Sequence, residues 1–290
     1  MKVRQGVNKR KRFSNKKRTG IFPVLLLFVG VFLIFSPADV YADTHYWQPD
    51  TGDSNWDDAA NWWASGGGIP ATGDDVSFDG NGVGNCVINV DTATIGWLDT
   101  AGYTGTIKQS GGNLTTSGDL SLKRGNWTTT NSKTITIGGT LNLGNDDANS
   151  VAMDLSAGGA VSVAYHVVFL AASSGTSTLT LGSQTLSFGN NWDSTDANAT
   201  FTCGTSTVTS TIGGANSMAL KSRDGNPFYK YSKTGTGLDW MESNIIVTNN
   251  LSVSAGEFRQ DGAAGNWKLT VGGNLAITGT ATWVKHGAAP

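Results

Sequence analysis

The sequence has few of the residue types that build catalytic and metal centres. It contains three histidines, two cysteines and two glutamates. No Ser/His/Asp set and no cluster with metal-ligand spacing can be assembled from their positions. Neighbouring aspartates such as Asp57 and Asp58 point to opposite faces of a strand or form ordinary turns, and the calcium-binding nonapeptide repeat is missing. We therefore predict a protein without enzymatic activity, cofactor or bound metal.

Long hydrophobic runs are confined to one segment. Residues 21–35 are uncharged and apolar, nine Lys or Arg precede them within residues 1–20, and the small residues Val40 and Ala42 follow. A basic region, a short apolar run and a small-residue site are typical of a secretory signal, with cleavage between Ala42 and Asp43. The run is shorter than the ~20 residues that a membrane-spanning helix needs, so an uncleaved anchor is the less favoured alternative.

Removal of residues 1–42 changes the charge of the protein. Of 20 basic residues, 11 remain beside 21 of the 22 acidic residues, so the mature chain has a net charge near −10. An acidic surface repels nucleic acid and anionic lipid and promotes solubility. We predict a secreted or cell-surface protein that does not bind nucleic acid and does not insert stably into a membrane.

Helix-forming stretches are also missing after residue 42, whereas glycine, serine and threonine are abundant, with 39 glycines in the chain. Such composition predicts many short strands joined by turns. Disorder is the competing interpretation of a chain rich in glycine and serine. Ten tryptophans and regularly spaced apolar residues argue against it, because disordered segments are poor in aromatic and β-branched residues.

One pattern recurs along the chain, with apolar residues at offsets 0, 2, 6 and 8 and usually Gly, Asn or Ser between the two pairs. Offsets 0 and 2 place two side chains on one face of a strand, and offsets 6 and 8 do the same after a turn. A gap after the fourth copy has room for two degraded copies, one near Phe201 and Val208. The average spacing is then about 22 residues, within the range typical of solenoids. The copies begin at Leu114, Ile135, Val161, Leu179, Ile245 and Leu269.

This spacing predicts an all-β fold, a right-handed parallel β-helix with coils of about 22 residues. One coil cannot bury its apolar side chains alone, but stacked coils form a continuous core and pair their backbones. A β-sandwich is the alternative, and it would show turns every ~8–12 residues without the longer period. The domains expected are the signal peptide at 1–42, a tryptophan-rich cap at 43–80 and solenoid repeats at 81–290.

The solenoid makes a prediction about Cys86 and Cys203. They are 117 residues apart, which is about five coils, or roughly 25 Å along the axis. A disulfide needs Cα atoms within ~7 Å of each other. We therefore expect both cysteines to be free and buried.

The segment 46–79 is unusually rich in aromatic residues. Its pattern Y-W…W-D-D-x-x-N-W…P-x-x-x-D-D-V-x-F resembles the opening of bacterial exported β-helix repeat proteins of the adhesin or autotransporter-passenger type. The stretch from Pro70 to Val76 is also similar to the start of extracellular G8-type β-helix modules. The resemblance covers about 35 residues and implies a role in cell-surface attachment or structure.

Two interpretations of the aromatic cluster remain open. A solenoid must shield its first coil from water and from edge pairing, and bulky rings among polar residues can do this. The alternative is a platform for an extracellular glycan or cell surface, formed by Trp47, Trp56, Trp62 and Trp63. We predict an exported cell-surface or extracellular, adhesin-like repeat protein, with a carbohydrate-binding or carbohydrate-active β-helix protein of the polysaccharide lyase or glycoside hydrolase type as the alternative.

Overall fold

The computed structural model describes residues 42–49, 54–82, 84–144, 149–170, 174–260 and 267–285. The expected signal peptide therefore lies outside the described residues, apart from Ala42. Residues 42–290 form one compact unit. The described residues include no helix that is long and apolar enough to cross a membrane. Their one helix is the short 3-10 helix η1 (Ala59–Asn61).

The strands form three long sheets and one short ladder. Sheet A contains, in spatial order, β2 (Trp62–Trp63), β1 (Thr44–Trp47), β3 (Asp75–Ser77), β6 (Leu98–Asp99), β9 (Leu120–Leu122), β12 (Leu141–Leu143), β15 (Val167–Phe169), β18 (Trp192–Ser194), β21 (Ser217–Ser222), β23 (Leu238–Met241), β26 (Glu257–Gln260) and β29 (Thr282–Lys285). Sheet B contains β4 (Cys86–Ile88), β7 (Thr106–Gln109), β10 (Gly125–Thr129), β13 (Val151–Leu155), β16 (Ser177–Leu181) and β19 (Ala199–Thr202). Sheet C contains β5 (Thr94–Ile95), β8 (Leu114–Thr116), β11 (Ile135–Ile137), β14 (Val161–Val163), β17 (Thr185–Phe188), β20 (Thr207–Ser210), β22 (Lys230–Lys233), β25 (Leu251–Val253) and β28 (Leu275–Ile277). The short ladder pairs β24 (Ile245–Val247) with β27 (Leu269–Val271).

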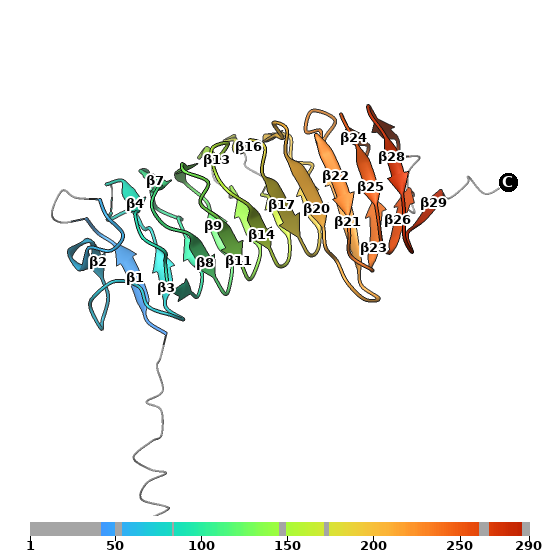
Figure 1. The fold of residues 1–290 in the computed structure, drawn as a ribbon. Coiled ribbons are helices and arrows are strands. Elements are labelled where there is room, and N and C mark those ends of the chain that lie inside the picture. The colour runs from blue at the N-terminus through green and yellow to red at the C-terminus, as the bar shows by residue number, and fades with distance from the viewer. Residues whose placement is uncertain are drawn as a thin grey trace, which may run out of the picture. The chain divides into compact units, whose positions relative to one another are not determined.

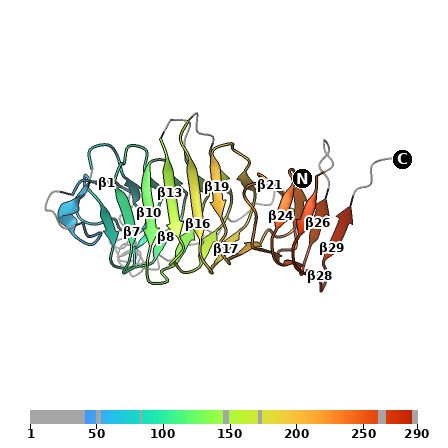
Figure 2. The same ribbon diagram turned by 90° about the horizontal axis from the view of Figure 1, so that it is seen from above.

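The chain passes through sheets B, C and A in turn and then repeats this circuit, which makes a three-sided β-helix of nine coils (Figures 1 and 2). Each strand pairs with the strand one coil earlier and one coil later. Among the described strands every pairing is parallel except that of β1 with β2. Parallel pairing between coils confirms the β-helix and excludes the β-sandwich, whose sheets are antiparallel.

Short alternating strands produce the core of the solenoid. In β8, β9 and β12 the first and third residues are buried and the middle residue is half-buried. Since side chains alternate along a strand, one face of every coil fills the interior and the other faces outward. Leu114, Leu120 and Leu141 are fully buried, and residues of successive coils stack in columns. The interior is thus a packed column of side chains.

The register gives the coil length directly. Ile135 pairs with Leu114 on one side and with Val161 on the other, and Tyr231 pairs with Leu251, so successive coils differ by 20 to 26 residues. The expected spacing near 22 residues is confirmed. The two degraded copies expected in the gap also exist, as the coils that contain Phe201 and Phe228.

The phase of the repeats differs from the prediction. The first three copies of the sequence pattern lie on sheets C and A. The fourth copy lies on sheets B and C, and the last two lie on the β24–β27 ladder and sheet C. Each corner needs the same arrangement of strand, tight turn and strand, so one pattern serves two different corners. The sequence therefore identifies corners and does not distinguish them.

One coil departs from regular pairing, between β21 and β22. The side chain of Asn226, which is buried, takes the place of a strand: its Oδ1 accepts a hydrogen bond from the Phe201 backbone N–H at 2.9 Å. Its Nδ2 donates to the carbonyl oxygens of Ser194 and Ala199. Phe228 then bridges to Val247 of β24. A side-chain amide thus satisfies backbone groups that a ladder would otherwise pair.

A buried ion pair lies in the same region, inside the solenoid. Lys233 of β22 and Asp239 of β23 are both fully buried, with Nζ and Oδ1 3.0 Å apart. The Asp239 carboxylate also accepts hydrogen bonds from the hydroxyls of Tyr231 and Ser210, each at 2.9 Å. Burial raises the pKa of the Asp239 carboxyl above its usual value, although the Lys233 ammonium and these hydrogen bonds oppose the shift. All four polar groups have partners, which is the condition for burying them.

Close contact between coils explains part of the glycine content. Gly112 lies between β7 and β8, and a Cβ atom placed there would overlap the carbonyl oxygen of Val90 in the preceding coil. The backbone φ at this position does not require glycine, so the restriction is steric. Glycine here allows the corners of neighbouring coils to stack at the inter-strand distance.

The cysteines follow the prediction in one respect and not in the other. Cys86 and Cys203 are both free, and five coils separate β4 from β19. Cys86 is buried, but Cys203 is only half-buried. The expected burial of Cys203 is wrong because the residue follows the last residue of β19 and so no longer belongs to the inward-facing row of the strand.

We expect a thiol reagent to modify Cys203 and not Cys86 in the folded protein at neutral pH. Burial raises the pKa of both thiols, that of Cys86 well above its usual range. The thiolate is the reactive form, so the rate at Cys203 should increase as the pH rises, and denaturation should release Cys86. Mass spectrometry after alkylation gives the number and place of the modified thiols. Modification of Cys86 before unfolding would contradict the structure.

Candidate functional site

The N-terminal segment closes the first coil at sheet A. Strand β1 adds to β3 in parallel, and β2 then pairs with β1 in the antiparallel direction, with Tyr46 opposite Trp63. Only two residues long, β2 leaves a short outer edge. A short antiparallel strand at the end of a parallel sheet limits pairing with further chains.

The same segment covers the first edges of the other two sheets. At sheet B, Asn55 bridges to Val87, and the backbone N–H of Trp56 donates to the Val87 carbonyl at 2.8 Å. At sheet C, the backbone N–H of Gly73 donates to the carbonyl of Thr94 at 2.9 Å. All three sheets are therefore closed by residues of the predicted cap.

Three of the tryptophans proposed for glycan contact are parts of this closure. Trp47, Trp56 and Trp62 are 0, 1 and 6% exposed, and their rings pack edge to face on one another with centroids 5.0 and 4.7 Å from Trp62. Their ring faces are covered and are not presented to a ligand. Trp63 is 58% exposed and lies against Tyr46. The structure thus separates the four residues into three that close the solenoid and one at its surface.

The last described coil gives a contrast with this closed end. Leu275 and Ile277 of β28 are 50 and 43% exposed, although they occupy inward positions of the coil. The equivalent row of the first coil, which includes Ile95, is fully buried beneath the cap. The cap therefore removes from water the apolar side chains that an uncovered coil exposes.

A buried His–Asp pair fastens the start of the cap. Nε2 of His45 lies 3.0 Å from Oδ2 of Asp74, and both side chains are nearly inaccessible. The Asp74 carboxylate also accepts hydrogen bonds from the backbone N–H groups of Asp43 and Ala71. Asp43, expected to follow the cleavage site, accepts hydrogen bonds from Ser65 and Gly66, which lower the pKa of its carboxyl. The pair has a structural explanation in the cap.

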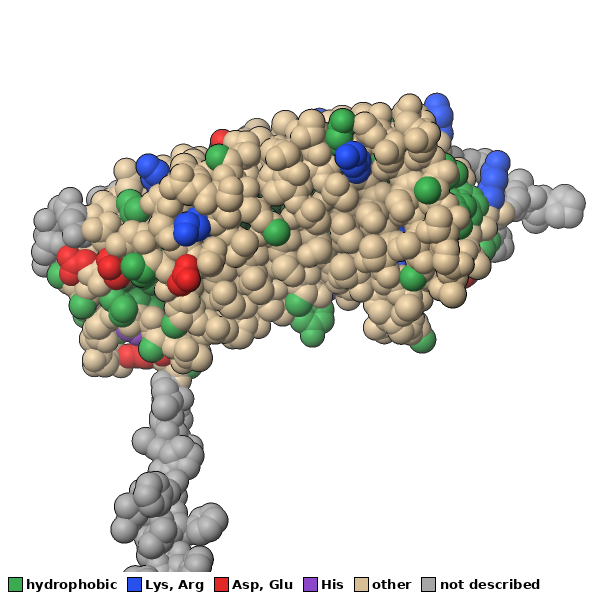
Figure 3. All heavy atoms as spheres, viewed as in Figure 1, with side chains coloured by type: hydrophobic (Ala, Val, Ile, Leu, Met, Phe, Trp, Pro, Cys, Tyr) green, Lys and Arg blue, Asp and Glu red, His purple; other side chains and the backbone are tan. Residues whose placement is uncertain are grey.

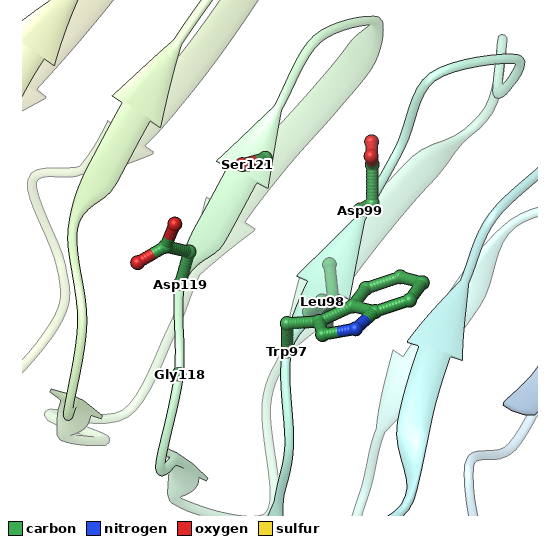
Figure 4. Close-up of a pocket in the computed structure, with 6 residues that line it drawn as sticks. All are labelled: Trp97, Leu98, Asp99, Gly118, Asp119 and Ser121. Atoms are coloured by element: carbon green, nitrogen blue, oxygen red, sulfur yellow. The ribbon is translucent and has the colours of Figure 1, made fainter. Parts of the chain in front are cut away.

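A separate group of side chains forms a shallow pocket on the outer face of sheet A. The pocket has a volume of about 400 Å³ and is open to solvent. Figure 4 shows its residues on two neighbouring coils, with Trp97 and Asp99 on one and Asp119 and Ser121 on the next. Leu98, the neighbour of both Trp97 and Asp99, is fully buried, so its two neighbours face outward. This pocket is the candidate functional site.

The polar groups of the pocket are held by neighbouring coils. Asp99 Oδ2 forms an ion pair with Lys123 Nζ at 2.6 Å, and its Oδ1 has no hydrogen-bond partner in the described part of the chain. Asp119 Oδ1 accepts from the Thr140 backbone N–H at 2.7 Å and so points towards the following coil. Ser121 Oγ accepts from Asn142 Nδ2 at 3.2 Å. These contacts fix the pocket's polar side chains in place.

Trp97 and a glycine shape the floor of the pocket. Trp97 is half-buried and its backbone N–H donates to Oδ1 of Asp75, one coil earlier. On the next coil, a Cβ atom at Gly118 would lie 3.6 Å from Cβ of Trp97. Glycine at this position therefore leaves space beside the indole that a side chain would occupy.

The sequence analysis did not identify Trp97, Asp99 or Asp119 as site residues. The usable signal was a tryptophan immediately before the core residue Leu98, at a position that alternation assigns to the outer face. That Asp119 lies in the next coil, beside this tryptophan, depends on the register, which sequence spacing does not fix.

Acidic side chains gather over the N-terminal end of the face seen in Figure 3, where most of the remaining surface is neither charged nor hydrophobic. Among the described residues, no group of three or more His, Cys, Asp or Glu side chains is arranged to hold a metal ion. Comparison of the chain with protein-family models, with characterised proteins and with solved structures found no match.

Proposed function

We propose that this chain is an exported, adhesin-like repeat protein of the cell surface or extracellular space, in which the β-helix is a rigid spacer without catalytic activity. The observation that carries the proposal is the closed N-terminal cap on a solenoid filled with side chains. Such a unit needs no partner to close its first coil. The signal-like sequence of residues 1–42 and the resemblance of residues 46–79 to exported β-helix proteins support the same conclusion.

The arrangement of the histidines favours a non-enzymatic role. His45 is occupied in the cap by Asp74, and His166 lies beside Tyr165 on an outer corner, with ring centroids 6.5 Å apart. His286 lies outside the described residues. In none of the described positions does a histidine contact a serine or cysteine that could act as a nucleophile.

Export is tested by expressing the full chain with a C-terminal epitope in a bacterium and separating its cells from the medium. We expect a product that begins at Asp43, found in the medium or degraded by protease added to intact cells. A chain that keeps residues 1–42 and stays in the cytoplasm would refute the proposal. Substituting Ala42→Arg, which removes the small residue at the cleavage site, provides the matched control for processing.

One observation favours a carbohydrate-active enzyme as the second candidate, because Asp99 and Asp119 line the same pocket. Glycosidases use two carboxylates that flank the bond to be cleaved. Here Asp99 is paired with Lys123 and Asp119 with the Thr140 backbone, so both carboxylates already have structural partners. Release of reducing sugars from neutral polysaccharides, lost in Asp99→Asn, would establish this candidate in place of the first.

A further inference from the structure

The pocket on sheet A combines the two features by which proteins hold sugars. The faces of a pyranose ring carry C–H groups and are apolar, while its rim carries hydroxyls that donate and accept hydrogen bonds. A tryptophan ring offers a large apolar face at low conformational cost. Trp97 supplies such a ring, and Asp99, Asp119 and Ser121 supply polar atoms around it. A few polar groups that converge on an apolar surface are typical of small-molecule sites.

The fold repeats these groups along one direction. Residues of successive coils stack in register, so that Ser77, Asp99 and Ser121 form one outward column on sheet A, and Asn142 continues it. Asp75, Trp97 and Asp119 occupy a second column, two residues earlier in each coil. Neighbouring strands are ~4.8 Å apart, so polar atoms recur at this interval along the axis. A chain of several sugar units can follow such columns, whereas a single small molecule would contact one coil.

The charge of the pocket selects among sugars. Three carboxylates, those of Asp75, Asp99 and Asp119, lie around Trp97, and the one nearby ammonium, that of Lys123, is already paired with Asp99. Uronic acids and sulfated sugars would be repelled by this arrangement. A small cation is also disfavoured, since cation-binding cages use several aromatic rings and Trp97 is the only aromatic residue that lines the pocket.

We propose that the Trp97 pocket binds a neutral, hydroxyl-rich oligosaccharide that lies along the solenoid axis across neighbouring coils. The inference deepens the proposed adhesin-like function and rests on it for its biological meaning. Trp97 stacks on one sugar ring, Asp119 and Ser121 bind hydroxyls of the same or the next unit, and the remaining coils hold the site away from the attachment point.

The test uses residues 43–290, which contain the whole described unit, and a panel of neutral gluco-, manno- and N-acetylglucosamine oligosaccharides of two to six units. Binding is measured by calorimetry and by tryptophan fluorescence. We expect at least one series to bind, with affinity increasing from two to four units. Trp97→Ala should weaken binding by at least about tenfold. The matched control is Trp63→Ala, which removes another exposed indole and should leave binding unchanged.

A second variant covers the case in which Trp97→Ala perturbs the fold. Ser121→Tyr fills the pocket from an outward position and leaves Trp97 in place, so it should also abolish binding while the melting temperature stays near that of the parent. No binding to any member of the neutral panel, equal binding by Trp97→Ala, or preference for polygalacturonate would overturn the proposal. Because the assay uses purified protein, its failure is distinct from a failure of export.

Discussion

Asp239→Ala is expected to lower the free energy of unfolding by about 3–5 kcal/mol, because it leaves the Lys233 ammonium buried without its carboxylate partner. Lys233 and Asp239 are both fully buried, with apolar layers from neighbouring coils around Asp239, where Met218 and Phe258 flank it in the same column. Water cannot replace the missing partner in such a place. Chemical denaturation followed by circular dichroism measures the change.

A surface pair provides the matched control for this experiment. Lys221 and Glu242 also join β21 to the end of β23, with Nζ and Oε2 2.9 Å apart, but about a third of each side chain is exposed. Lys221→Met should therefore change stability by no more than about 1 kcal/mol. The combined variant Lys233→Met, Asp239→Leu and Tyr231→Phe should recover most of the loss, since apolar groups of similar volume can replace a buried pair. Equal effects at the buried and the surface pair would contradict the burial described.

Trp62→Ala is expected to destabilise the protein by about 3–5 kcal/mol, the usual cost of truncating a buried aromatic residue. Trp62 contacts Trp47, Trp56 and Phe78, and its Nε1–H donates to the Trp56 carbonyl at 2.7 Å. Its removal leaves a cavity where the cap meets the first coil. Thermal unfolding should show the loss, and hydrogen exchange should increase first in β4 and β5, whose edges the cap covers.

The adjacent residue is the natural control for Trp62. Trp63 follows it in the chain and in β2, but points outward and is 58% exposed. Trp63→Ala should change stability by about 0.5 kcal/mol or less. A large loss from Trp63→Ala, or a small one from Trp62→Ala, would show that the tryptophan-rich segment does not close the solenoid.

The fold itself could be predicted because its unit is local. The apolar pairs of β8 and β9, or of β11 and β12, lie within nine residues of each other, and period-two alternation with a glycine turn between them is visible without any knowledge of partners. The repeat then implies stacking, since one coil has no core of its own. The cap could be predicted for the same reason, as a dense aromatic cluster at the start of a repeat array.

The pocket could not be predicted in this way, because its residues come together through the register between coils. Coil lengths vary from 20 to 26 residues, so counting does not place Asp119 beside Trp97. The pairing of Leu98 with Leu120 does so, and it depends on how two complete coils pack. The same applies to the pairing of Lys233 with Asp239, which sequence reading left unnoticed.

Sequence by itself determined that the chain from residue 43 onward is an acidic all-β solenoid with a tryptophan-rich start, because alternation, turns and composition are properties of short segments. Tertiary structure decided which tryptophans are buried, which corner each repeat occupies and which outward side chains share a pocket. Those features depend on the lateral register of stacked coils, and this register is set by the packing of the whole interior rather than by any one segment.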